Sequence, residues 1–321
     1  MKAAVVHAFG EAPRFEEFAE PMLAESEVMV NVLAAGLHPI VRMLADGSHY
    51  GSAHMLPLVA GVDGVGQLED GQRVYFGLTR PPYGTMAERA AVPRSMCLPL
   101  PASLDEVTAA ALFNPGLSSF LALRWRAQLK PGETVLVLGA SGAAGRIAIQ
   151  FARLLGAGRI IALGRNERIL RTLPELGADV VISLNQSQED LSKAIARESA
   201  QDGIHVILDY LWGSPTEAII AGVTREGLTH TAPRVRLIEI GQMAGSTITL
   251  PASVLRSSGL EISGSGAGTA AVEQVIQAIP QFLEYAASGK LRIETTAVPL
   301  AEVEAAWRRP NLDNRRLVFV P

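Results

Sequence analysis

The stretch TVLVLGASGAAG, residues Thr134–Gly145, decides the fold of this 321-residue chain. Its first part, Thr134–Leu138, is apolar and rich in β-branched residues, as is typical of a buried parallel strand. Small residues follow at once, and Arg146–Leu155 then places apolar side chains at helical spacing. The sequence therefore predicts a strand, a tight turn and a helix in direct succession.

The turn between this strand and this helix has the composition of an anion-binding loop. Backbone N–H groups in the first turn of a helix have no intrahelical acceptor, and the helix dipole favours negative charge beside them. Small residues leave that backbone accessible. We therefore expect the pyrophosphate of a dinucleotide to bind here, the alternative being a tight turn without a ligand. The residues expected to contact the cofactor at this turn are Ala140, Ser141, Gly142, Ala143, Ala144 and Gly145.

The next apolar run, Arg159–Leu163, predicts a second strand whose end indicates the kind of dinucleotide. An NAD site commonly has Asp or Glu at this place to hold the ribose 2′-OH, whereas an Arg accommodates a 2′-phosphate. No acid stands directly after the run, and Arg165 and Arg168 offer planar donors to a phosphate. The sequence thus predicts NADPH, unless both arginines are solvated surface residues. The residues expected to contact this part of the cofactor are Gly164, Arg165, Asn166 and Arg168.

Length and composition limit the classes of protein. The chain is long enough for two ordinary domains, and its net charge of −4 provides no basic field for nucleic acid. No apolar stretch approaches the roughly twenty residues of a membrane span, and no signal peptide is recognisable, so a soluble cytoplasmic protein is expected. The single cysteine, Cys97, excludes an intrachain disulfide and is expected to be a small apolar filler.

The pattern of elements changes along the chain. Up to about Pro101, short strand-like runs are separated by Gly and Pro, which predicts a strand-rich barrel or sandwich. From Thr134 onward, apolar runs alternate with helical segments, which predicts a doubly wound parallel sheet of six strands. The last part of that sheet is expected at Ile248–Leu250 and Leu260–Ser263. The final strand, Arg316–Val320, is expected to return to the first domain.

Six segments stand in the order found in the medium-chain dehydrogenase/reductase superfamily. They are AAGLHPIVRMLADGSHY (34–50), LVAGVDGVGQLEDGQRVYFG (58–77), YGTMAERAAVP (83–93), FNPGLSSFLAL (113–123), LGADVVISL (176–184) and GKLRIETTAVPLAEVEAAW (289–307). Together they resemble the zinc-independent quinone oxidoreductase branch. The resemblance implies a GroES-like catalytic domain, residues 1–115 and 266–321, and a Rossmann dinucleotide-binding domain, residues 116–265.

The alcohol dehydrogenases of this superfamily hold a catalytic zinc, and such a site requires three N, S or O ligands from the protein. Where they have a cysteine this chain has Leu37, and where they have Gly-His-Glu it has Gly61-Val62-Asp63. The resemblance therefore implies that no metal is bound. The alternative is a substitute cluster drawn from His38, His49, His54 and Asp63.

Without a metal, the resemblance implies hydride transfer from NADPH to an activated substrate, a quinone or an α,β-unsaturated carbonyl. A donor near the substrate oxygen would assist the reaction. We predict that His38, which stands where the family has asparagine, is this donor, although a packing role beside Pro39 is the alternative. Tyr50 is a second candidate and Arg42 a weaker one. The competing functions are zinc-assisted alcohol dehydrogenation and NADPH binding without turnover.

Further residues are expected at the cofactor. The resemblance places Ser118 at a helix start beside the phosphates. Gly241, and the pair Gly264 and Ser265, follow two predicted strands, and ligands of such sheets bind at the carboxyl ends of the strands. Backbone contacts to the nicotinamide ribose are expected there, unless these are plain turns. Similar proteins pair a late sheet edge in a homodimer, and we expect the same of this chain.

Overall fold

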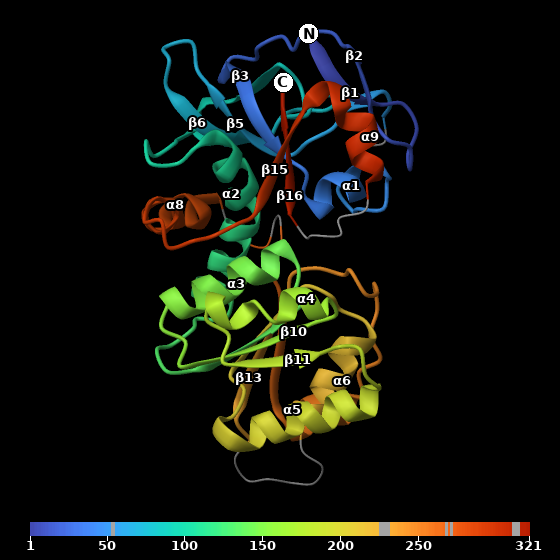
Figure 1. Ribbon diagram of the computed structural model, residues 1–321, viewed down its shortest axis with the longest axis vertical. Helices are drawn as coiled ribbons and strands as arrows, with labels where there is room; N and C mark the ends of the chain where they lie inside the picture. The colour runs from blue at the N-terminus through green and yellow to red at the C-terminus, as the bar shows by residue number, and fades with distance from the viewer. Residues whose placement is uncertain (53–54, 225–231, 267–268, 270–271, 310–314) are drawn as a thin grey trace. The chain divides into compact units, whose positions relative to one another are not determined.

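The computed structural model describes residues 1–52, 55–224, 232–266, 269, 272–309 and 315–321. The chain forms two compact units (Figure 1). Unit 1 comprises Met1–Asn114 and Ala286–Pro321, and unit 2 comprises Pro115–Tyr285. Unit 1 thus contains both ends of the chain, and unit 2 is one continuous segment.

Unit 1 is rich in antiparallel strands, as the sequence predicts. Its larger sheet has the order β15-β16-β3-β5-β6-β8, with β7 also paired to β3, and a smaller sheet has the order β2-β1-β4. The final strand pairs with β3 and so returns to the first unit, as predicted. The strands are β1 (Lys2–Val6), β2 (Arg14–Glu17), β3 (Glu27–Gly36), β4 (Leu58–Val59), β5 (Asp63–Gln67), β6 (Arg73–Gly77), β7 (Arg89–Pro93), β8 (Leu98–Pro99), β15 (Thr295–Pro299) and β16 (Arg316–Val320). The helices are α1 (Pro39–Ala45), the first part of α2 (Glu106–Leu121), the end of α8 (Val272–Ala287) and α9 (Val303–Arg308).

Strand β3 contributes to two apolar clusters of unit 1. Val30 and Val32 pack in one cluster with buried residues of neighbouring strands, among them Phe76. Cys97 packs against the same cluster and burial raises the pKa of its thiol, which agrees with its expected role as an apolar filler. Beyond the end of β3, Leu37 belongs to the second cluster. The chain is therefore anchored in the core immediately before His38.

Unit 2 contains the predicted doubly wound parallel sheet. Its six strands have the order β11-β10-β9-β12-β13-β14, and every neighbouring pair is parallel. The strands are β9 (Thr134–Leu138), β10 (Arg159–Gly164), β11 (Val180–Ser183), β12 (Val206–Asp209), β13 (Arg234–Glu239) and β14 (Gly259–Gly264). Ile248–Leu250, expected as part of the last strand, is not a strand, and the N–H of Thr249 donates to the Glu217 carboxylate instead.

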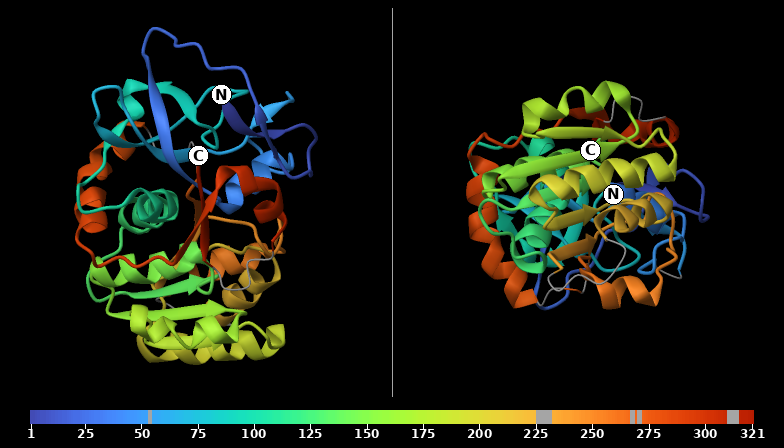
Figure 2. Two further views of the ribbon diagram at one scale, coloured as in Figure 1. Left: turned by 45° about the horizontal axis from the view of Figure 1, so that its top comes forward. Right: turned by 90° about the horizontal axis from the view of Figure 1, so that it is seen from below.

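Helices cover both faces of this sheet. In Figure 1, α3 and α4 lie on one side of the strands and α5 and α6 on the other, and the left view of Figure 2 again shows the strands between helices. All of β9 is buried, because it is a central strand of a sheet covered on both faces. The helices are α3 (Ala143–Leu154), α4 (Glu167–Leu170), α5 (Gln188–Asp202), α6 (Ser214–Val223) and α7 (Ala252–Ser257), with a π-helical turn at Ala122–Arg126.

Both boundaries between the units fall inside helices, α2 and α8. The first boundary lies within one residue of the expected division, whereas the second lies after Tyr285 and was expected after residue 265. The difference arises because α8 packs on unit 2. The Phe282 ring lies 6.2 Å from the Phe120 ring and 5.9 Å from the Phe151 ring, measured between centroids.

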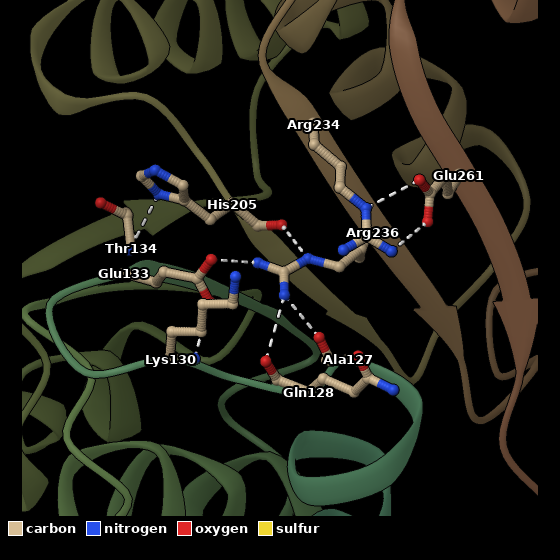
Figure 3. A network of polar contacts seen from close by, with 9 residues as sticks. All are labelled: Ala127, Gln128, Lys130, Glu133, Thr134, His205, Arg234, Arg236 and Glu261. Carbon is tan, nitrogen blue, oxygen red and sulfur yellow. Dashed lines mark hydrogen bonds and ion pairs between the residues drawn. The ribbon is translucent and has the colours of Figure 1, made fainter.

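A buried arginine links several segments of unit 2 near the amino ends of its strands (Figure 3). Arg236 of β13 is 4% exposed, and its guanidinium lies 2.5 Å from the Glu133 carboxylate. It also donates to Ala127 O at 2.5 Å and to His205 O at 3.3 Å. Arg234, two residues earlier, forms an exposed ion pair with Glu261 of β14 instead. Arg236 is therefore buried, whereas Arg234 on the same strand is exposed to solvent.

Within the part of the chain that the structure describes, every helix is too short or too polar to cross a lipid bilayer.

Candidate functional site

Backbone hydrogen bonds hold the turn between β9 and α3 against β10. The N–H groups of Gly139 and Ala140 both donate to Leu163 O, at 2.9 and 2.7 Å. Gly139 has a φ of +92°, a conformation that glycine adopts without strain. Gly142 then precedes α3 as its N-cap residue. The turn before the first N–H groups of α3 is thus held by hydrogen bonds to β10 at its start and leads into the helix at Gly142.

Two glycines allow α3 and β10 to approach this turn closely. A Cβ on Gly145 would lie 2.4 Å from Gly139 O and 2.7 Å from the Cα of Ala140. A Cβ on Gly164 would lie 2.8 Å from the Cβ of Ser141. Both distances are shorter than real side chains tolerate. The turn is therefore a cradle of backbone that any larger residue at these positions would fill.

The predicted residues of this turn differ in what they can offer a ligand. Ala140 is fully buried and its N–H is already bonded to Leu163 O, so it shapes the turn and has no donor left. The four residues after Ala140 are half-buried, and Gly145 is buried. The half-buried positions are Ser141, Gly142, Ala143 and Ala144.

The segment after β10 presents two exposed arginines. Arg165 follows the strand directly and Arg168 lies on α4. Asn166 lies between them, and its Oδ1 accepts the N–H of Ile169 at 3.2 Å, which caps α4. The side-chain oxygen of Asn166 is therefore used within the chain. Arg165 and Arg168 are both exposed residues.

An acid that the sequence argument passed over, Glu167, lies between these arginines. Its Oε1 accepts hydrogen bonds from the Ser183 hydroxyl and from Asn185 Nδ2, the latter at 3.1 Å. Asn185 also donates to Arg165 O at 2.8 Å. The bonds from Ser183 and Asn185 lower the pKa of Glu167. The carboxylate thus keeps its charge and is held toward the end of β11.

The predicted positions after β13 and β14 lie at the carboxyl end of the sheet. Gly241 N–H donates to Asp209 O at 3.2 Å, and Ser265 N–H donates to Glu239 O at 2.8 Å. Gly264 is paired with Glu239 in the sheet. Because the N–H groups of Gly241 and Ser265 are engaged, a ligand here would meet other backbone groups of these turns.

Two carboxylates that the sequence argument missed lie at the ends of β12 and β13. Asp209 is fully buried and accepts hydrogen bonds from Leu211 N, Trp212 N and Thr216 Oγ1 at 2.6 to 2.9 Å. Burial raises the pKa of Asp209, and burial together with the nearby charge of Asp209 raises the pKa of Glu239. Asp209 thus fixes the turn after β12. The local sequence around Asp209 does not indicate this role.

A buried pair of hydroxyls lies beside the β9–α3 turn. Ser118 lies near the end of α2 and not at a helix start as expected, because α2 begins at Glu106. It is half-buried, and the adjacent Ser119 is fully buried. Ser119 Oγ donates to Pro115 O at 2.7 Å, so it accepts from the Tyr210 hydroxyl, 2.8 Å away. A Cβ on Gly139 would lie 3.2 Å from the Cβ of Tyr210. Burial raises the pKa of Tyr210, and the phenol therefore keeps its proton.

His38 in unit 1 is a buried imidazole that has no hydrogen-bond partner among the residues that the structure describes. It is 1% exposed and occupies the N-cap position of α1, but its side chain does not cap that helix. Its Nε2 lies 3.4 Å from Asp63 Oδ1, and neither ring nitrogen makes a hydrogen bond. Buried polar atoms are almost always bonded, so this residue departs from the general rule.

Asp63 and Tyr75 complete what we call the His38 cluster, made of His38, Asp63 and Tyr75. Asp63 Oδ2 accepts a hydrogen bond from the Tyr75 hydroxyl, and its backbone oxygen accepts one from Thr85 Oγ1 at 2.8 Å. Burial, and then the charge of Asp63, raise the pKa of Tyr75. A Cβ on Gly36 would lie 2.5 Å from His38 Nε2, so glycine at this position makes room for the imidazole.

The other predicted donors of unit 1 lie in different surroundings. Tyr50 is 80% exposed, and its ring lies 4.1 Å from the ring of His49. Arg42 donates to Trp307 O at 2.6 Å and lies over the Trp307 ring, and burial lowers the pKa of its guanidinium. Arg42 therefore links α1 to α9. Of these three predicted donors, His38 is the one that lies in a polar cluster.

Comparison with known proteins identifies the family. A family model described as zinc-binding dehydrogenase matches residues 143–284, within unit 2. The solved quinone oxidoreductase of Thermus thermophilus, described together with its NADPH complex, is 30% identical, with a TM-score of 0.83 and complete coverage of both chains. The chain belongs to the medium-chain dehydrogenase/reductase superfamily, in its quinone oxidoreductase-like branch.

The names of two further relatives refer to reductases. A probable NADPH-dependent quinone reductase of Emericella nidulans is 27% identical over the full length of both proteins. A trans-enoyl reductase of Aspergillus terreus is 27% identical over 60% of this chain and 59% of its own.

The donor set of a catalytic zinc, found in some medium-chain dehydrogenases, does not converge among the residues that the structure describes. No group of three or more His, Cys, Asp or Glu side chains comes together in those ranges. His38 and Asp63 supply two donors, and His49 Nδ1 accepts the N–H of Gly51 at 3.0 Å. His54, the fourth member of the substitute cluster considered above, lies outside the described residues.

Proposed function

We propose that this medium-chain dehydrogenase/reductase is an oxidoreductase that reduces a quinone or an α,β-unsaturated carbonyl with NADPH and without a catalytic zinc. The observation that carries the proposal is the β9–α3 turn, a backbone cradle at a helix N-terminus followed one strand later by Arg165 and Arg168. The quinone reductase and enoyl reductase names of its relatives support the substrate class.

In this proposal, the two ends of the cofactor meet different parts of unit 2. The first N–H groups of α3, preceded by Ser141 and Gly142, hold the pyrophosphate, and Ser118 assists with its hydroxyl. Arg165 and Arg168 hold the 2′-phosphate, while Glu167 is kept away from it by Ser183 and Asn185. Gly164, Asn166, Gly241, Gly264 and Ser265 shape the surroundings through their backbone.

Bound NADPH supplies the hydride for this chemistry. The chain's own contribution is to orient the acceptor, to exclude water and to provide a proton for the oxygen on which negative charge develops. We assign the proton to His38, because among the described residues of unit 1 it is a buried imidazole whose ring nitrogens make no hydrogen bond. Tyr50, being exposed, is the second candidate of this proposal.

The proposal is tested by measuring NADPH and NADH oxidation with purified, metal-analysed protein against an ortho-quinone, a para-quinone, a linear enone and a simple aldehyde. We expect turnover of a quinone or of the enone with NADPH, unaffected by chelator. Turnover of the aldehyde alone, lost on chelation, would support zinc-assisted alcohol dehydrogenation instead. Tight NADPH binding without turnover of any acceptor would support a non-catalytic role.

Replacing both Arg165 and Arg168 by glutamine is expected to weaken NADPH much more than NADH. A charged partner of a phosphate typically contributes about 1.5–3 kcal/mol, which corresponds to roughly a ten- to hundredfold change in Kd. The dissociation constants of both cofactors are measured by titration calorimetry.

The matched control for this prediction removes the same charge elsewhere in unit 2, in the variant Arg171→Gln with Arg197→Gln. Both residues are exposed and lie on or after helices of the same sheet. The control should leave the ratio of the two constants unchanged. Equal losses for NADPH and NADH in the Arg165 and Arg168 variant would contradict the assignment.

We also propose a cytoplasmic homodimer. Strand β14 ends the sheet of unit 2, and among the described residues β13 is its strand partner, so its other edge could pair with a second copy. Leu255 of the preceding helix is 47% exposed near this edge. Light scattering of the purified chain should give twice its mass of 34.1 kDa. A monomer mass would contradict the proposed homodimer.

A further inference from the structure

The end of strand β10 has a different neighbour on each of its two sides. On one side, a Cβ added to Gly164 would lie 2.8 Å from the Cβ of Ser141 in the β9–α3 turn. On the other side, Gly164 is paired in register with Ser183, the last residue of β11. The strand order β11-β10-β9 therefore puts the β9–α3 turn and the end of β11 on opposite sides of β10.

The carboxylate of Glu167 is held on the β11 side. Its Oε1 accepts hydrogen bonds from the Ser183 hydroxyl and from Asn185 Nδ2. The N–H of Asn185 in turn donates to Ser183 Oγ at 3.1 Å, which joins the two donors to each other. The acid that follows β10 is thus bonded on the side of β10 away from the turn at which the pyrophosphate is proposed to bind.

Asn185 connects this acid to the neighbouring arginine. The same Nδ2 donates to Arg165 O at 2.8 Å, so one amide holds both Glu167 and the backbone of Arg165. Arg171, four residues after Glu167, is the further charge that acts on the carboxylate, and together with the bonds from Ser183 and Asn185 it lowers the pKa of Glu167. The carboxylate is therefore ionised at neutral pH.

The segment after β10 consequently contains groups suited to either of two cofactors. A carboxylate after this strand can accept a hydrogen bond from the ribose 2′-OH of NADH, and it repels a 2′-phosphate. An arginine at the same place favours the 2′-phosphate of NADPH. Which cofactor binds more tightly then depends on the side of β10 at which the Glu167 carboxylate is held.

We propose that Glu167 is a latent acceptor for the ribose 2′-OH of NADH, and that Ser183 and Asn185 select NADPH by holding its carboxylate against the end of β11. Both are positioning residues, because they act on the cofactor through Glu167. When their donors are removed, the carboxylate can turn toward the cofactor, where it repels a 2′-phosphate and accepts from a 2′-OH. The inference rests on the proposed NADPH site and deepens it by naming what decides between the two cofactors.

The first test is the double variant Ser183→Ala with Asn185→Ala, studied by calorimetric titration of the full chain with NADPH and with NADH. We expect Kd for NADPH to rise about three- to fivefold and Kd for NADH to fall about twofold. The change is limited because Glu167 and Asn185 are exposed and water screens the carboxylate. An unchanged ratio of the two constants would overturn the inference.

The variant Glu167→Gln tests whether the two donors act through the carboxylate. Glutamine removes the charge and keeps an oxygen that can accept from Ser183 and Asn185. In this background, the double substitution should change the ratio of the constants by no more than about twofold, because no charge is left to release. A change as large as in the chain with Glu167 would mean that Asn185 acts through the backbone of Arg165, which would also overturn the inference.

Gln186→Ala is the matched control. It removes another exposed amide of the same segment, whose Nε2 donates to Ser183 O at 2.6 Å and not to Glu167. The control should leave the ratio of the two constants unchanged. An equal change in this variant would show that any loosening of the segment after β11 has the effect, and would contradict the role of Glu167. If the double variant does not fold, Asn185→Ala alone carries the same comparison.

These measurements distinguish the inference from the proposed function, because binding is followed without an acceptor. The expected change of cofactor preference in a chain that reduces none of the quinones or the enone would support the role of Glu167 and refute the reductase function. Turnover with NADPH, together with an unchanged preference in the double variant, would refute the inference and leave the proposed function standing.

Discussion

Replacing Arg236 by methionine is expected to lower the free energy of unfolding by about 3–5 kcal/mol, because it leaves Glu133 as an uncompensated charge in a largely buried site. The arginine also bonds Ala127 O, Gln128 O and His205 O, whose acceptors would lose a charged partner (Figure 3). The Glu133 side chain is only 15% exposed, so water cannot fully replace the guanidinium.

Arg234→Met is the matched control for that prediction. It removes the same residue type from the same strand, but its ion pair with Glu261 is more than half exposed on both sides. Exposed pairs contribute about 0–1 kcal/mol. Urea unfolding of the full chain, followed by circular dichroism, should therefore show a large shift of the midpoint for Arg236→Met and a small one for Arg234→Met. Similar shifts for the two variants would show that burial of Arg236 does not govern its contribution.

A second variant, Gly145→Ala, is expected to weaken NADPH binding at least about a hundredfold and to destabilise the chain by about 1–3 kcal/mol. The added Cβ would lie 2.4 Å from Gly139 O and 2.7 Å from the Cα of Ala140, both of them backbone atoms that no rotamer change can move away. Relief requires a shift of α3 or of the turn, which would displace the first N–H groups of the helix from the phosphate.

Gly142→Ala provides the comparison three residues earlier in the same turn. Its φ of −76° suits any residue, and its nearest backbone atom would lie 3.3 Å away. We expect it to change stability by less than about 1 kcal/mol, since only a small adjustment is needed. Calorimetric titration with NADPH and thermal unfolding measure both quantities. Normal NADPH affinity in Gly145→Ala would mean that the close packing of α3 on the turn is not required for the cofactor.

The sequence pattern correctly predicted those elements whose structure depends on residues close together in the chain. The strand, turn and helix around Gly142 lie as predicted, and the parallel sheet follows from the alternation of apolar runs and helical segments. Ile248–Leu250 failed as a strand because extended composition does not decide whether a partner strand is available. The end of unit 2 was misplaced because Phe282 meets Phe120, more than a hundred residues away in sequence, and no local pattern carries that contact.

The sequence by itself determined the two-part organisation of this chain, its superfamily and the place of the glycine-rich turn, since these depend on periodicity and on residues without bulky side chains. Only the tertiary structure decided which polar groups meet. It brought the Glu167 carboxylate to Ser183 and Asn185, and it placed Asp63 beside His38 and the Tyr75 hydroxyl against Asp63. Hydrogen bonds and ion pairs act over a few ångströms, and the fold sets those distances between residues that are remote along the chain.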